Sequence, residues 1–163
     1  MKSNKKLKNL NLEPLSIAKY FYERGVKNLS LIQKLIYLTF VEVIEKENTL
    51  LFNEEWQAWS GGPVLESVFR IMDEHLEKHG NYQRLFEQTP PLKDKKVIPY
   101  CQAWAERYQN YAQNKDHYKL AAETQTLPWQ LARRNLSNEW EGEKIELADI
   151  IHFARQRSDE IRA

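Results

Sequence analysis

The stretch that decides the fold is "LIQKLIYLTFVEVIEK", residues 31–46. Its apolar residues surround the helix they would form instead of lying on one stripe: Leu31, Ile32, Leu35, Ile36, Leu38, Phe40, Val41, Val43 and Ile44. A helix that is apolar on nearly every side belongs at the centre of a bundle. Just before it, Ser30 and Gln33 match the S-x-x-Q capping box of helix starts, so the sequence predicts a central helix beginning near Ser30.

Further helices are predicted on both sides of this central helix. Pro14 opens a first helix, because proline is favoured in the first turn, and Gly25 ends it. After the central helix, Pro63 is expected to start a long helix that runs to about residue 78 with one apolar stripe. Later helices are predicted at about residues 100–114, 115–123 and 145–160, with another restarting at Pro128. The expected fold is therefore mainly α, a single compact helical domain.

A short segment around residues 50–59 interrupts the helical period. Residues 50–52 and 56–59 read as two short extended pieces joined around Asn53, which predicts a small β-hairpin-like insertion. The segment leads into "WQAWSGGPV", residues 56–64, where Gly61 and Gly62 allow a sharp turn. We interpret this corner mainly as a joint between the β element and the central helices.

Length and composition indicate one domain with its own core. The chain has 163 residues, of which 42% are hydrophobic, and it contains five tryptophans. A net charge of +1 favours no strong attraction to nucleic acid. One cysteine excludes an intrachain disulfide framework and fits a reducing compartment. With neither a secretory signal nor a membrane span visible, the sequence predicts a cytoplasmic protein that does not enter a membrane.

The first residues differ in character from the rest. Residues 1–12 carry four lysines and are expected to form a flexible basic tail: Lys2, Lys5, Lys6 and Lys8. The helical domain is expected to occupy residues 13–163.

The candidate catalytic and metal-binding groups are few. His75 and His79 have the i, i+4 spacing that can hold zinc, but the H-E-x-x-H arrangement is absent and no third ligand is indicated. Cys101 shares a helix face with Trp104 and is expected to be a buried, inert thiol. The residues therefore predict no cofactor, no metal and no enzymatic activity.

Taken in order, several motifs resemble the Panacea domain, also called the SocA-like or GepA phage-associated family. The shared features are a Gln-Lys-Leu helix, an Ala-Trp-x-x-Gly-Pro-Val corner and a downstream Pro-Trp pair, over about residues 15–155. The matching positions, read mainly as structural, are Gln33, Lys34, Leu35, Tyr37, Trp59, Gly62, Pro63, Val64, Pro128 and Trp129. The chain departs from the family in having Gly61 where an aromatic is common. Where the family often has Thr-His, it has Glu123-Thr124 or Thr124-Gln125, depending on a one-residue shift.

The resemblance implies an antitoxin that neutralises a cognate protein toxin by direct protein–protein binding, in a type II-like toxin–antitoxin or phage-defence system. The residues expected to contact the toxin are Trp56, Glu66 and Arg70. Three other functions stay open: a DNA-binding autoregulator of its operator, using the lysine tail with Arg133 and Arg134; an adaptor that delivers the toxin to a protease; and a small hydrolase.

Overall fold

The computed structural model describes residues 6–134 and 142–162, and within them the fold is mainly α, as predicted. The helices are α1 (Pro14–Glu23), α2 (Leu29–Glu47), α3 (Glu66–His79), α4 (Gln83–Gln88), α5 (Ile98–Gln113), α6 (Lys119–Thr124), α7 (Leu127–Arg133) and α8 (Leu147–Arg162). The strands are β1 (Lys8–Asn9), β2 (Thr49–Leu50), β3 (Trp56–Trp59), β4 (Gly62–Val64) and β5 (Glu143–Ile145). None of the described helices combines the length and the apolar character needed to cross a membrane.

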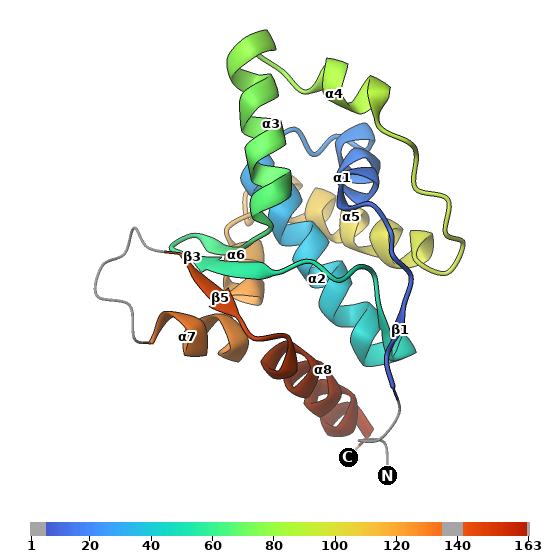
Figure 1. Ribbon diagram of the computed structural model, residues 1–163, viewed down its shortest axis with the longest axis vertical. Coiled ribbons are helices and arrows are strands. Elements are labelled where there is room, and N and C mark those ends of the chain that lie inside the picture. Colours follow the sequence, from blue (N-terminus) through green and yellow to red (C-terminus); the bar gives the residue numbers. More distant parts are fainter. Residues whose placement is uncertain (1–5, 135–141, 163) are drawn as a thin grey trace.

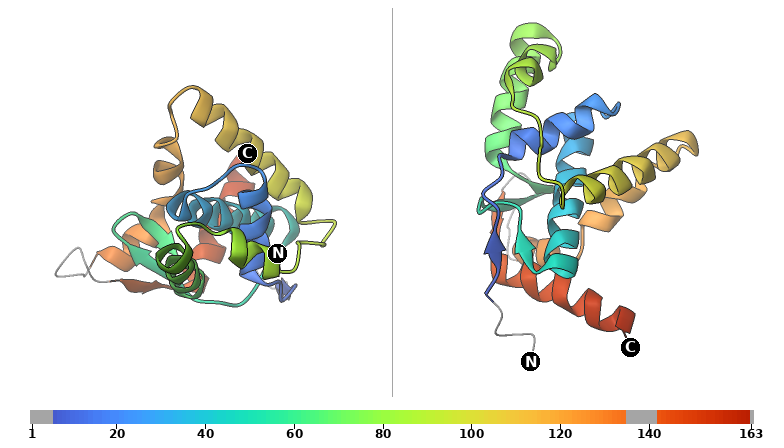
Figure 2. Two further views of the ribbon diagram at one scale, coloured as in Figure 1. Left: turned by 90° about the horizontal axis from the view of Figure 1, so that it is seen from above. Right: turned by 90° about the vertical axis from the view of Figure 1, so that its right-hand side faces the viewer.

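The central position of α2 is confirmed. It packs against α1, α3, α5, α6 and α8, and Figures 1 and 2 show it in the middle of the molecule. The predicted capping box is wrong, however. The N-cap is Asn28, two residues before Ser30, and the Asn28 Oδ1 atom accepts a hydrogen bond from the Leu31 amide at 3.1 Å. Asn is as good an N-cap as Ser, and Gln33 has a different partner, described below.

The β elements are present but pair differently from the prediction. Residues 50–52 and 56–59 do not form a hairpin with each other. Instead β3 pairs antiparallel with β4 on one side and with β5 on the other, while β2 pairs in parallel with β1. Pro63 therefore lies in β4, and the helix expected to start there begins at Glu66. The φ angle that proline imposes suits a strand edge as well as a first helical turn. The sequence around Pro63 therefore does not distinguish a strand from a helix start.

The N-terminal segment is ordered further toward its start than expected. Lys8 and Asn9 form β1, and the amides of Leu10 and Leu12 donate to the carbonyls of Leu50 and Leu51 at 3.0 and 2.9 Å. The flexible tail predicted for residues 1–12 is therefore wrong for residues 8–12, which are fastened along the segment after α2. Residues 1–5 lie outside the described part of the chain.

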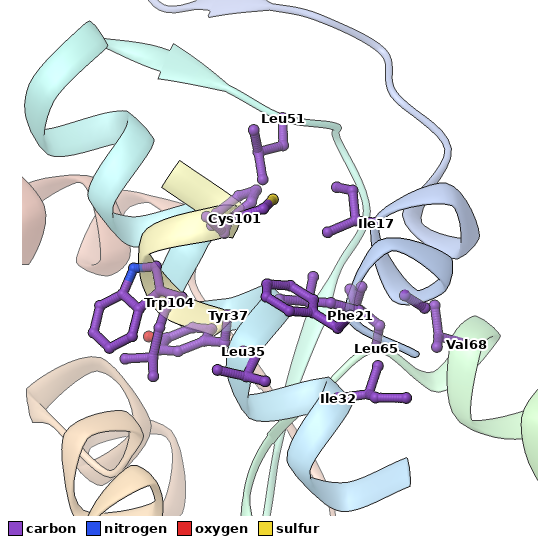
Figure 3. Close-up of a cluster of buried hydrophobic side chains, with 14 of the residues drawn as sticks. Ile17, Phe21, Ile32, Leu35, Tyr37, Leu51, Leu65, Val68, Cys101 and Trp104 are labelled. Carbon is purple, nitrogen blue, oxygen red and sulfur yellow. The ribbon is translucent and has the colours of Figure 1, made fainter. Parts of the chain in front are cut away.

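The core lies around α2, and it includes one of the residues predicted to contact a toxin. Figure 3 shows buried side chains from α1, α2, α3 and α5 converging, among them Phe21, Leu35 and Cys101. Trp56 belongs to this core, with only 1% of its surface exposed. A partner cannot reach Trp56 in this structure, so its prediction as a toxin contact is wrong. Burial also raises the pKa of the Cys101 thiol to about 12, consistent with the inert thiol that was predicted.

Candidate functional site: a groove between α2, the β3–β4 corner and α3

Motif residues from separate parts of the chain gather around one groove. It has a volume of about 480 Å³ and lies between the start of α2, the β3–β4 corner and α3. The motif residues that line it are Gln33, Lys34, Trp59, Gly62, Pro63 and Val64. Leu35 and Tyr37 instead belong to the core. The groove falls within the size range of ligand-binding clefts in proteins.

Gln33 fixes the relative position of two walls of the groove. Its side-chain amide donates to the Leu65 carbonyl at 3.0 Å and accepts from the Leu65 amide at 3.0 Å. Leu65 is the residue immediately before α3, and both residues are buried. The Leu65 carbonyl also accepts from the Phe69 amide at 3.0 Å, whereas Gln33 is the partner of the Leu65 amide. A buried amide without a partner is costly, so Gln33 joins α2 to the start of α3.

Lys34 places an amine in the same groove. Only 9% of its surface is exposed, and its Nζ atom donates to the Ser30 Oγ atom at 2.7 Å. Burial lowers the pKa of the Lys34 amine, because desolvation disfavours the charged form. Among the described side chains, no carboxylate lies within ion-pair distance of this amine.

The rest of the groove is largely apolar. The rings of Trp59 and Phe69 meet edge to face, with 4.9 Å between their centroids, and form part of one wall. Leu76 lies farther along α3 and is 42% exposed. Figure 1 shows why, because this half of α3 extends away from the body of the fold toward α4. Leu76 therefore extends the apolar surface of the groove along α3.

The Pro-Trp pair supports the corner from behind. The Trp129 indole Nε1–H donates to the Trp59 carbonyl at 2.8 Å, and an Arg133 N–H donates to the Ala58 carbonyl at 2.8 Å. Pro128 is buried in the first turn of α7. These contacts support the interpretation of "WQAWSGGPV" as a joint, held by α7 and β5 together with the helices.

The two adjacent glycines of the corner differ sharply. Gly62 has a φ of +136°, and a Cβ atom there would lie 3.1 Å from the Thr124 Oγ1 atom, whereas Gly61 faces open space. Gly62→Ala is therefore expected to lower the free energy of unfolding by about 1–3 kcal/mol, the usual cost of such a backbone conformation. Gly61→Ala is the matched control and should change it by less than about 1 kcal/mol in either direction. Urea unfolding of both variants tests this, and equal effects would contradict it.

Glu66 and Arg70, the other predicted contact residues, lie outside the groove lining. Arg70 is exposed and Glu66 is half-buried on the first two turns of α3, where an Arg70 Nη2–H donates to a Glu66 carboxylate oxygen at 2.6 Å. Glu66 also accepts a hydrogen bond from the Gln57 side chain at 2.9 Å. An exposed ion pair of this kind contributes little to stability, so a partner could engage both residues as the rim of a contact surface.

The groups weighed for catalysis do not meet at the groove. The rings of His75 and His79 lie 5.5 Å apart on α3, and neither they nor His117 and Cys101 line it. In the described part of the chain, no three His, Cys, Asp or Glu residues are grouped as a metal site requires. Sequence reasoning missed the amine–hydroxyl contact of Lys34 with Ser30, although their i, i+4 spacing on a helix could have indicated it.

Comparison with known proteins leaves the family open. No family model matches the chain, and neither does any curated protein or solved structure. The function is therefore inferred from the groove and from the motifs that line it.

Proposed function

We propose that this protein is an antitoxin, which neutralises a cognate protein toxin by direct binding through the groove between α2, the β3–β4 corner and α3. The observation that carries the proposal is the convergence of the motif residues. Gln33 and Lys34 in one motif and Trp59 to Val64 in another line a single accessible surface, although about 25 residues separate them in the sequence. Motifs that served packing alone would have no need to face an open groove.

The physical character of the groove suits protein binding without turnover. Its walls are held by the Gln33–Leu65 hydrogen bonds and by the Trp129–Trp59 contact, so it exists before a partner arrives. A preformed surface binds with a smaller entropy cost than one that must be ordered. Trp59 and Leu76 supply partly exposed apolar surface, and tryptophan in particular is enriched among residues that dominate binding energy.

The proposal is tested by co-expression with the open reading frame next to the gene. That frame alone should arrest growth, and this protein should relieve the arrest. Leu76→Asn should weaken binding by about tenfold or more, because it removes a leucine from the buried contact. Leu127→Asn is the matched control, since Leu127 is 47% exposed on α7 and does not line the groove.

Three results would contradict the proposal: no toxicity, no relief, or equal relief and equal affinity for both leucine variants. A pull-down of the co-expressed pair measures the affinity difference directly.

A protease adaptor would use the same toxin contact, and is distinguished by a fall in toxin level that requires a functional protease. DNA autoregulation is distinguished by binding of operator DNA with a steep salt dependence; it has less support because Arg133 is engaged with Ala58.

A small hydrolase is the second candidate, and one contact favours it. The Ser30 hydroxyl lies 2.7 Å from the Lys34 amine, an arrangement in which an amine could activate a serine. A fluorophosphonate probe provides the test. Labelling of Ser30 in the wild-type protein that is lost in Lys34→Met would favour the hydrolase, whereas absence of labelling would favour the binding function.

A further inference from the structure

The groove contains a buried lysine, Lys34, for which the described residues supply no counter-charge. Lysine is almost never buried unless it is paired, because moving a charge out of water is costly. Lys34 nevertheless has 9% of its surface exposed, and its only hydrogen bond within the described residues is to the neutral Ser30 hydroxyl. Burial alone accounts for the lowered pKa of this amine, with no carboxylate opposing it. Residues 6–134 and 142–162 thus place no anion beside this amine.

The surroundings of Lys34 add to the positive electrostatic potential of the groove. The amine lies near the start of α2, where the helix dipole is positive, and the first turn of α2 carries no acidic residue. Lys27, on the rim of the groove, adds a second cation, which donates to the Tyr22 carbonyl at 2.9 Å. The groove is therefore an apolar trough with a positive centre.

We propose that the groove binds an apolar segment of the partner protein that carries one Asp or Glu side chain, whose carboxylate pairs with the Lys34 amine and accepts from the Ser30 hydroxyl. This rests on the proposed function, because it names the chemistry of the partner at the same site. The apolar wall runs along α3 from Phe69 to Leu76, roughly two turns or ~10 Å. A polypeptide segment with apolar residues beside the acidic one would cover that length.

An internal acidic side chain fits this groove better than the end of a chain. C-terminal carboxylates are typically captured by successive backbone N–H groups, whereas the cationic contact here is a side-chain amine. The carboxylate would supply the counter-charge that Lys34 lacks, and the apolar flanks would exclude water from the pair. Charge-assisted hydrogen bonds in such surroundings are stronger than neutral ones, so the acidic residue would decide which partner binds.

A displayed library of random peptides, selected on the immobilised full-length protein, tests the proposal without requiring the toxin. The wild-type protein should enrich apolar peptides with one internal Asp or Glu. Lys34→Met, which keeps the length of the side chain and removes its charge, should lose the acidic preference. Lys34→Met should also remain folded, because it removes a buried charge, and its unfolding temperature should be no lower than that of the wild type.

The enriched peptide then allows a double-mutant cycle. Changing its acidic residue to the amide should weaken binding to the wild-type protein by at least about tenfold, as for a buried charge pair that loses one partner. The same change should alter binding to Lys34→Met by less than about twofold, since independent sites show no coupling. Lys46→Met, at an exposed position farther along α2 and outside the groove lining, should leave the tenfold effect in place.

Four results would overturn the proposal. Two concern the selection: no enrichment at all, or enrichment of peptides without acidic residues. The other two are loss of binding when only the peptide C-terminus is amidated, and the same dependence on the acidic residue in Lys34→Met as in the wild-type protein. The outcome is separable from that of the toxin test. Coupling without relief of toxicity would reject only the antitoxin role, and relief without coupling would reject only the acidic partner.

Discussion

Replacing Trp56 with alanine is expected to lower the free energy of unfolding by about 3–5 kcal/mol, the range for emptying a buried aromatic site. The Trp56 ring meets the Tyr37 ring edge to face at a centroid distance of 5.0 Å, and the Phe40 ring lies 5.7 Å away. A domain of this size is stable by only about 5–15 kcal/mol. Urea unfolding followed by circular dichroism should therefore show a variant that keeps a fraction of the wild-type stability.

Trp59→Ala is the matched control on the opposite face of β3. Trp59 is half-buried and its ring contacts the Phe69 ring within one wall of the groove, so less packing is lost on its removal. We expect a clearly smaller loss of stability but weaker partner binding, because the groove loses part of its wall. A loss for Trp56→Ala no larger than that for Trp59→Ala would contradict the burial of Trp56.

The two tryptophans also show what local sequence could predict. An extended segment sends alternate side chains to opposite faces, and β3 does so, with Trp56 and Ala58 buried and Gln57 and Trp59 partly exposed. The extended conformation predicted for residues 56–59 implies that Trp56 and Trp59 face apart. It did not indicate which face was the core, because that depends on α2 and on β5, and β5 follows β3 by more than 80 residues.

The difference between local pattern and long-range contact also separates the correct helix predictions from the incorrect ones. The centre of the fold was predictable because the apolar pattern of residues 31–46 lies within the helix itself. The capping box was wrong because Ser30 and Gln33 match a local pattern, whereas Gln33 is bonded to Leu65, 32 residues later. The groove could not be predicted for the same reason, since its walls come together only through such long-range contacts.

Gln33→Met is the second substitution with a large expected effect. It removes the Gln33 contacts with the Leu65 backbone and leaves the buried Leu65 amide unsatisfied, whereas the Leu65 carbonyl still accepts from the Phe69 amide at 3.0 Å. An unsatisfied buried amide costs about 1–3 kcal/mol and the lost hydrogen bond to the carbonyl about 0.5–1.5 kcal/mol, so the free energy of unfolding should fall by about 2–4 kcal/mol. Urea unfolding measures the total, and faster hydrogen exchange at the Leu65 amide would locate the effect.

Gln102→Met provides the same substitution at an exposed position of α5, where the side chain only approaches Glu106 at 3.4 Å, and should change stability by less than about 0.5 kcal/mol.

The two variants should also differ in binding. Among the described residues of α3, only Val68 and Met72 are buried, so the Gln33–Leu65 contact is a large part of what holds this helix against α2. Because α2 and α3 form facing walls of the groove, Gln33→Met should weaken partner binding although the apolar lining is intact. Wild-type affinity in a folded Gln33→Met variant would show that the groove keeps its shape without this contact.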